Sequence, residues 1–146
     1  KKAVLAWLEG GGRVNATYER GKRSGITLLM GAAFYGHEQV VEMFLRGGAE
    51  VNLQDSRGET ALMCAAVKGH ARVVDLLIRR GTELNLQSSN GFTALMDAAY
   101  FGHERVLGCG VRHRPAGLQQ SSVLRQPRCT LAPSIVPVMS LTYTLG

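Results

Sequence analysis

The chain is poor in the residues that mark several common functional classes. Its 146 residues include only three cysteines, Cys64, Cys109 and Cys129, with no Cys-x-x-Cys spacing and no even count. Neither a disulfide framework nor a zinc site is therefore predicted, and a reducing compartment fits best. The chain also lacks a phosphate-binding loop, a His-Glu-x-x-His motif, a nucleophile elbow and a convergent carboxylate pair. We expect no enzymatic activity and no cofactor in this segment.

Proline and acidic residues are missing from different parts of the chain. All four prolines lie after residue 108, in a stretch that has four arginines and no Asp or Glu. The formal net charge of +6 therefore divides into +2 for residues 1–107 and +4 for the remainder. Such a composition predicts a disordered, low-order basic tail over residues 108–146. The composition changes abruptly at residue 108. We therefore hypothesise that the tail comes from out-of-frame or intron-derived translation, which sequencing of the transcript would test.

No apolar run in the sequence has the features of a membrane span. Residues 131–145 are too few and too rich in proline and hydroxyl side chains to cross a bilayer, and the start has no signal-peptide pattern. We therefore expect no membrane partner and a cytoplasmic location, with the nucleus as the alternative.

What the chain does have is a threefold internal repeat. The runs that begin at Gly25, Gly58 and Gly91 read GITLLMGAAFYGHEQVV, GETALMCAAVKGHARVV and GFTALMDAAYFGHERVL. Their spacing of 33 residues is typical of stacked helix-turn-helix units rather than of a single globular core. A repeat of this kind favours binding over catalysis.

The middle unit shows the expected local structure. Thr60 is a good N-cap for a first helix over residues 61–67, and Gly69 can supply the left-handed residue that ends it. Val73, Val74 and their neighbours at positions 76 and 77 fall on one stripe of a second helix. Neither helix is long enough to be stable alone in water, so stability must come from stacking of the units.

The run from Gly58 to His70 resembles the ankyrin repeat, whose usual pattern is Gly-x-Thr-Pro-Leu-His-x-Ala-Ala-x-x-Gly-His. The resemblance recurs in register, covers residues 1 to about 107, and implies an all-α ankyrin-like solenoid with short hairpin fingers. Two departures repeat in every unit, and they are predicted only to weaken a helix start and a side-chain hydrogen bond. Leu28, Ala61 and Ala94 stand where the family prefers Pro, and Met30, Met63 and Met96 replace its His.

The repeat predicts five segments. Residues 1–24 are a partial unit, residues 25–57 and 58–90 are complete units, residues 91–107 are a truncated unit, and the tail follows. The sequence does not begin with Met, and residues 4–8 resemble only the second helix of a unit. We therefore expect the sequence to begin inside a longer protein. In the last unit the register fails at Gly108, where Cys109 and Gly110 take the places of Leu76 and Leu77.

The segments that join the units, residues 15–25, 52–58 and 85–91, are rich in turn-forming residues and are called fingers below. The first finger has four more residues than the second. The insertion carries Tyr18, Arg20, Lys22 and Arg23, which makes this longer basic tip the most individual part of the repeats.

The candidate binding surface consists of positions whose residues differ between units, while the residues that define the repeat pattern stay the same. The resemblance implies that they line a concave face, where aromatic side chains supply contact area at low entropic cost. Alternatively, the aromatic members merely pack between repeats. The candidate residues are Phe34, Tyr35, Val67, Lys68, Tyr100 and Phe101 before the Gly-His turns, and Ser24, Ile26, Arg57, Glu59, Asn90 and Phe92 in the fingers.

The recurring His37, His70 and His103 are expected from the repeat architecture itself, and no metal site is predicted from them. The sequence therefore predicts a protein-protein interaction module, a scaffold or adaptor without a small-molecule substrate. A substrate-selecting regulatory segment of a larger enzyme and a truncated product without independent function remain alternatives. Nucleic-acid binding through the basic finger and the tail arginines ranks below these, because acidic residues are interspersed through the repeats.

Overall fold

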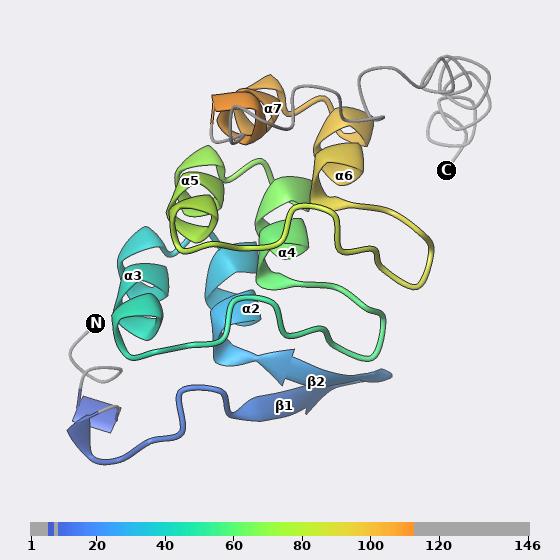
Figure 1. The fold of residues 1–146 in the computed structure, drawn as a ribbon. Coiled ribbons are helices and arrows are strands. Elements are labelled where there is room, and N and C mark those ends of the chain that lie inside the picture. The colour runs from blue at the N-terminus through green and yellow to red at the C-terminus, as the bar shows by residue number, and fades with distance from the viewer. Residues whose placement is uncertain (1–5, 8, 113–146) are drawn as a thin grey trace, which may run out of the picture. The chain divides into compact units, whose positions relative to one another are not determined.

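The structure is a computed structural model that describes residues 6–7 and 9–112. The predicted tail and most of the predicted first partial helix lie outside these residues. Two short strands are followed by six helices (Figure 1), and their bounds are β1 Thr17–Arg20, β2 Arg23–Thr27, α2 Leu28–Phe34, α3 Glu38–Arg46, α4 Ala61–Val67, α5 Ala71–Arg79, α6 Ala94–Tyr100 and α7 Glu104–Arg112.

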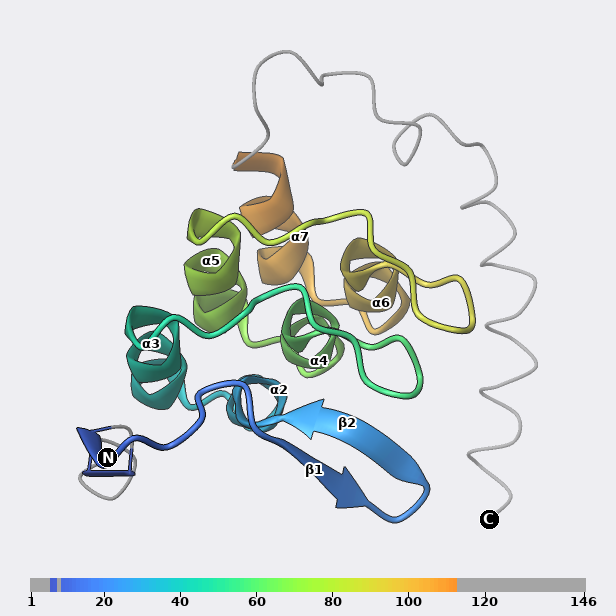
Figure 2. The same ribbon diagram turned by 60° about the horizontal axis from the view of Figure 1, so that its bottom comes forward.

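The six helices form three antiparallel pairs that stack in two layers. Helices α2, α4 and α6 contact one another in sequence and form one layer, while α3, α5 and α7 form the other. The fingers project beyond the first layer, as Figures 1 and 2 show. The predicted fold class is therefore confirmed, and the two-stranded sheet is an addition that comes from the long first finger.

A threonine begins the first helix of every unit. The side-chain oxygens of Thr27, Thr60 and Thr93 accept hydrogen bonds from backbone N–H groups three residues on, at 3.1, 3.3 and 3.3 Å. Thr27 also donates its own N–H to the Met30 sulfur at 3.4 Å. These caps satisfy N–H groups that a helix start leaves unpaired. The threonine therefore defines the helix start even though the usual proline is absent.

The Gly-His turns of the second and third units join each of these units to the one before it. Gly69 is left-handed with φ of 73°, as predicted, and a Cβ there would lie 2.7 Å from the His103 ring. That ring reaches back across the stack, because its Nε2 lies 3.0 Å from the Val67 carbonyl oxygen. His70 makes the equivalent bond to the Phe34 carbonyl at 3.1 Å. A carbonyl only accepts, so Nε2 carries the proton in both residues.

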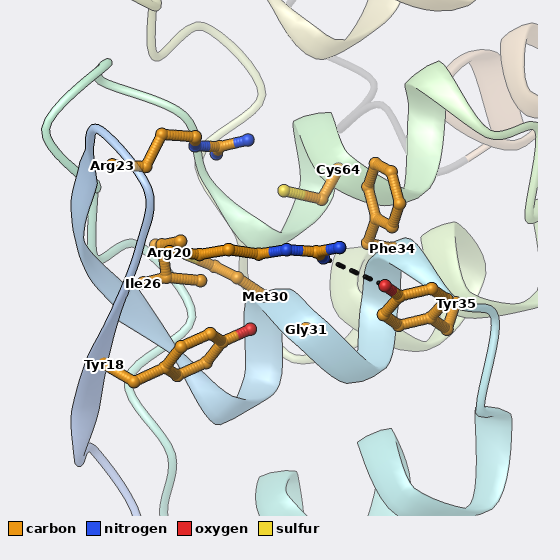
Figure 3. A pocket seen from close by; sticks show the side chains of 9 residues that line it. All are labelled: Tyr18, Arg20, Arg23, Ile26, Met30, Gly31, Phe34, Tyr35 and Cys64. Atoms are coloured by element: carbon orange, nitrogen blue, oxygen red, sulfur yellow. Dashed lines mark hydrogen bonds between the residues drawn. The ribbon is translucent and has the colours of Figure 1, made fainter.

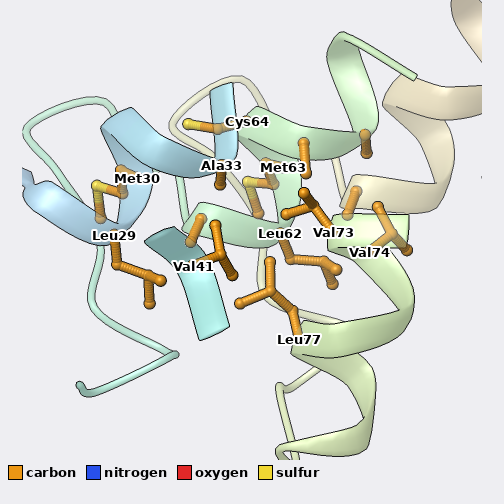
Figure 4. Close-up of a cluster of buried hydrophobic side chains, with 14 of the residues drawn as sticks. Leu29, Met30, Ala33, Val41, Leu62, Met63, Cys64, Val73, Val74 and Leu77 are labelled. Atoms are coloured by element: carbon orange, nitrogen blue, oxygen red, sulfur yellow. The ribbon is translucent and has the colours of Figure 1, made fainter. Parts of the chain in front are cut away.

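The core runs through the stack between the two helix layers. Leu29, Leu62, Val41, Val73 and Leu77 are all buried, and Figure 4 shows them interdigitating with small side chains. Alanines at equivalent positions, Ala33 and Ala66, are fully buried and allow the first helices of these two units to approach closely, whereas their equivalent in the last unit, Ala99, is exposed. Each helix pair thus buries its apolar stripe against the neighbouring pair, which supplies the stability that short helices lack alone.

The last unit differs from the other two in its packing, and one expectation for it needs correction. Leu95 is only half-buried, unlike the equivalent Leu29 and Leu62, because the described residues provide a neighbouring unit on one side of it alone. The helical register does not end at Gly108, since α7 continues to Arg112. Small residues make this possible: Cys109 and Gly110 are buried, and a Cβ at Gly110 would lie 2.7 Å from the Leu95 side chain.

The first finger folds into an antiparallel hairpin. Thr17 pairs with Thr27, Tyr18 with Ile26 and Arg20 with Arg23, with a register shift between Tyr18 and Arg20. The four extra residues therefore form a two-stranded ribbon, while the shorter fingers are built from turns. Among the described residues, no helix has the length and apolar character needed to cross a membrane.

Candidate interaction surface

Most of the predicted binding residues lie on the face that the fingers share with α2, α4 and α6. We call this face the concave face, and its aromatic side chains belong to two groups. Tyr35 is 55% exposed in the first group, while Phe92, Tyr100 and Phe101 are 41, 51 and 52% exposed in the second. Tyr35 is exposed although the next unit packs beside it, so packing between repeats is not its only role, whereas the second group belongs to the last described unit, which has a neighbouring unit on one side alone.

The first aromatic group is bracketed by two cations. The Phe34 and Tyr35 rings pack edge to face with centroids 5.3 Å apart. The Lys68 ammonium from the next unit lies 4.7 Å from the Phe34 centroid, a cation–π contact, and Arg20 donates a hydrogen bond to the Tyr35 hydroxyl at 2.9 Å. The pair of aromatic rings therefore has a cation on each side, Arg20 at Tyr35 and Lys68 at Phe34.

The second aromatic group is continuous from the third finger to the last Gly-His turn. Phe92 packs edge to face on Tyr100 with centroids 6.5 Å apart, and Tyr100 packs in the same way on Phe101 at 5.1 Å. Phe101 in turn stacks on His103 at 6.3 Å with an angle of 22° between the rings. These side chains present aromatic edges and faces to solvent.

The remaining predicted positions divide into exposed and buried residues. Ser24, Arg57 and Asn90 are exposed on successive fingers, and Glu59 is half-buried. Ile26 is only 7% exposed, because its strand lies against α2, so its prediction as a contact residue is corrected. Val67 is half-buried, and its carbonyl accepts the hydrogen bond from the next unit's histidine.

Backbone hydrogen bonds hold successive fingers together. The Ser56 N–H donates to the Ser24 carbonyl at 2.9 Å, and the Ser89 N–H donates to the Arg57 carbonyl at 2.8 Å. Gln54 adds a side-chain bridge to the Gln87 carbonyl at 3.0 Å. The finger side of the concave face is thus a connected surface rather than a set of separate loops.

A pocket lies at the base of the first finger (Figure 3). It has a volume of about 60 Å³ and is lined by Tyr18, Arg20, Arg23, Ile26, Met30, Gly31, Phe34, Tyr35 and Cys64. The Arg20 side chain crosses the pocket to reach Tyr35, and the Tyr18 hydroxyl points toward Gly31. A Cβ at Gly31 would lie 2.8 Å from that hydroxyl, so a side chain at this position would displace the Tyr18 hydroxyl from its place in the pocket.

A family model described as ankyrin repeats (3 copies) matches residues 29–108, which is more than half of the chain. The chain belongs to the ankyrin-repeat family. No curated protein matches it. Ankyrin repeats generally act as protein-protein interaction modules and are typically non-catalytic. The resemblance read from the Gly58–His70 run is therefore confirmed.

An ion cluster ties the first finger of this ankyrin stack to the second. Arg23 bonds to Asp55 through two of its nitrogens, one of them at 3.0 Å, and to Glu59 at 2.6 Å. The Asp55 side chain is fully buried and also accepts the Arg57 and Glu59 N–H groups at 2.9 Å each. Burial by itself would raise the pKa of Asp55, but these hydrogen bonds outweigh it and hold the pKa below its usual value.

Two other titratable groups on the concave side lie at equivalent repeat positions. Burial raises the pKa of the Cys64 thiol to about 12, with a smaller contribution from the Glu59 charge, so this thiol stays protonated and unreactive. Burial also raises the pKa of Asp97 to about 6, again with the Glu59 charge acting in the same direction. Within the described residues, no group of His, Cys, Asp and Glu side chains could hold a metal ion.

The sequence did not identify the pocket or the ion cluster of the ankyrin stack. The basic tip was noted, but Tyr18 and Arg20 were not among the predicted site residues, and Asp55 was treated as an ordinary finger residue. One signal was present: Gly31 stands where the next units have Cys64 and Asp97. A glycine at a variable, surface-facing position beside an insertion indicates that another side chain occupies its space.

Proposed function

We propose that this ankyrin-repeat stack is a scaffold or adaptor that binds a protein partner along its concave face and finger tips. The exposure of Tyr35, Phe92, Tyr100 and Phe101 on one connected face is the observation that carries the proposal. Aromatic side chains are enriched among the residues that dominate binding energy at protein interfaces, because each buries a large area and loses few rotamers. A role in catalysis is no part of the proposal, and neither is a cofactor.

The charge arrangement favours a protein over a nucleic acid. Arg23, one of the three cations of the first finger, is already paired with Asp55 and Glu59. Nucleic-acid binding depends on cations that are free to replace counterions along a phosphate backbone. A cytoplasmic, reducing setting remains part of the proposal, supported by Cys64 and Cys109, which are both buried free thiols.

The test is a selection of binding peptides from a randomised display library, followed by affinity measurements with three variants. Tyr35→Ala and Tyr100→Ala are expected to leave helicity unchanged and to weaken binding of the selected peptides by tenfold or more, since hot-spot truncations cost about 2 kcal/mol or more. Gln39→Ala, at an exposed position of α3 in the other helix layer, is the matched control and should bind as the wild type does.

Two results would contradict the proposal. One is a selection that enriches no peptide above background. The other is a selected peptide whose affinity is the same for wild type, Tyr35→Ala and Tyr100→Ala, because the binding surface would then lie elsewhere. A loss of circular dichroism signal in the tyrosine variants would instead assign these side chains to packing.

A further inference from the structure

The pocket at the base of the first finger has the chemistry of an anion site. Its rim carries the guanidinium of Arg20 and the hydroxyls of Tyr18 and Tyr35, which are hydrogen-bond donors. Its floor is apolar, formed by Ile26, Met30 and other side chains of the hairpin and α2. The combination suits a carboxylate attached to a short aliphatic stem.

Two cations near the pocket, Arg20 and Lys68, make no ion pair within the described part of the chain. Arg20 bonds to a neutral hydroxyl there, and Lys68 contacts a neutral ring. Arg23 differs, since its charge is met by Asp55 and Glu59. Two cations that no described carboxylate pairs with therefore flank the Phe34–Tyr35 pair at one end of the concave face.

Arg20 has donor capacity left for a ligand. A guanidinium carries five N–H groups, and the bond to the Tyr35 hydroxyl uses one of them. The Tyr18 hydroxyl makes no hydrogen bond to another described residue, although it points into the pocket. Arg20 and Tyr18 come from the same strand and thus move together, so a ligand between them would meet donors that are already placed.

We propose that this pocket is a carboxylate subsite that takes an Asp or Glu side chain of an acidic partner segment, with Arg20 as the principal donor. The inference rests on the proposed function, because it names the chemistry of the partner. The volume of about 60 Å³ is well below the roughly 150 Å³ of a cavity that holds benzene, so a carboxylate and its short stem match the pocket better than an aromatic ring does.

The first experiment needs no partner and uses sodium propionate, a mimic of the Glu side chain. Backbone amide and Arg Nε–H resonances of the full chain are followed by NMR during a titration at constant ionic strength. We expect saturable shifts at Gly31 and at the Arg20 Nε–H. Propionamide, which has the same shape without the charge, should produce no saturable shift.

Three variants separate the pocket from general electrostatic attraction. Arg20→Ala should weaken propionate binding by tenfold or more, because it removes the donor of the charge-assisted hydrogen bonds to the carboxylate. Lys22→Ala removes the same charge from the same exposed hairpin without touching the pocket and should bind as the wild type does. Gly31→Ala should abolish the shifts, since its Cβ occupies the space beside the Tyr18 hydroxyl while alanine remains a good helix residue.

The outcomes distinguish this inference from the proposed function. Equal losses for Arg20→Ala and Lys22→Ala, unchanged binding in Gly31→Ala, or no saturable shift at all would overturn the subsite. A display selection could still yield peptides that depend on Tyr35 and Tyr100, in which case the interaction surface would stand without the subsite. If the subsite is correct, the selected peptides carry an Asp or Glu that contributes to their affinity for the wild type. Removal of this residue causes no further loss of affinity for Arg20→Ala, and amidation of the peptide C-terminus leaves the affinity for the wild type unchanged.

Discussion

Truncation of Arg23 to alanine tests how strongly the first finger is held against the second. The variant removes the guanidinium that bonds to Asp55 and Glu59 and leaves the Asp55 carboxylate buried, with only two backbone N–H groups as partners. An uncompensated charge in a protein interior is costly because it has lost its hydration without regaining an opposite charge.

The expected cost follows from the exposure of the two partners. Breaking a fully buried ion pair costs about 3–5 kcal/mol. The Arg23 side chain is 23% exposed, so water already screens part of the pair, and Asp55 keeps its backbone hydrogen bonds. We therefore expect a loss of about 2 kcal/mol in the free energy of unfolding, which for a domain of this size lowers the melting temperature by about 10 °C.

Urea denaturation followed by far-ultraviolet circular dichroism measures this loss, with Lys22→Ala as the matched control. Lys22 is exposed at the hairpin tip, so its truncation should change stability by less than about 0.5 kcal/mol. The double variant Arg23→Ala/Asp55→Asn should recover part of the loss, because an amide at position 55 still accepts the backbone N–H bonds and carries no charge.

The same pair predicts a pH dependence of stability. The pKa of Asp55 is lower in the folded chain than in the unfolded chain, so its contribution is fully present above the unfolded value of about 3.9 and is lost as pH falls through the folded value. In Arg23→Ala the folded pKa moves back up, so the stability gap to wild type should narrow in acid. A variant as stable as wild type at neutral pH, or a gap that does not change in acid, would refute the reasoning.

Two further predictions concern backbone strain and a desolvated carboxylate. Gly69 and Gly81 are both left-handed, but a Cβ at Gly69 would meet the His103 ring at 2.7 Å whereas one at Gly81 meets nothing within 4 Å. In urea denaturation, Gly81→Ala should cost about 1 kcal/mol and Gly69→Ala about 2–3 kcal/mol, because the latter also displaces a hydrogen-bonded ring; equal costs would contradict this. The folded pKa of Asp97 is raised to about 6, so its charge destabilises the fold above that pH and the penalty disappears as pH falls toward the unfolded value. Asp97→Asn should therefore raise the denaturation midpoint at neutral pH and leave it unchanged near the unfolded pKa of about 3.9, whereas equal increases at both pH values would contradict the assignment.

The parts of the fold that could be predicted from the sequence are those set by local chemistry. The first helix of the middle unit was expected over residues 61–67, and α4 has those bounds, because Thr60 caps it and Gly69 provides the left-handed turn after it. Both signals act within a few residues and recur at a fixed period. The positions of the helices could therefore be predicted from one unit, and the other two units repeat the same signals.

The errors arose where contacts between distant segments override local signals. Gly108 and Gly110 disfavour a helix when judged by propensity alone. In the structure, α7 nevertheless continues to Arg112, since Gly110 lets the helix approach Leu95 on α6. Ile26 was misassigned for a related reason: the length of the insertion was visible, but its folding into a hairpin that turns Ile26 inward was not.

The pocket shows how one variable position gives each unit a different chemistry without changing the frame. Gly31, Cys64 and Asp97 occupy equivalent places on the first helices, and the structure makes them a cavity, a protonated buried thiol and a desolvated carboxylate. By contrast, the fully buried alanines two residues further along the helices, at positions 33 and 66, cannot vary, because a larger side chain there would separate neighbouring helices.

Positions 31, 64 and 97 follow one another along the stack, so the chemistry of the concave face differs between its two ends. The first-finger end carries a small pocket and two cations that have no ion-pair partner in the described residues, while the third-finger end carries the Asp97 carboxylate on the same helix as the exposed Tyr100 ring. Under the proposed function, a partner that matched only one end would leave polar groups of the other unpaired or uncovered, so the proposal requires contact along the whole face for discrimination. The same proposal makes the number of stacked units set how much of a partner is recognised, and makes the stability of the stack, through Arg23 and the Gly-His turns, a condition for specificity.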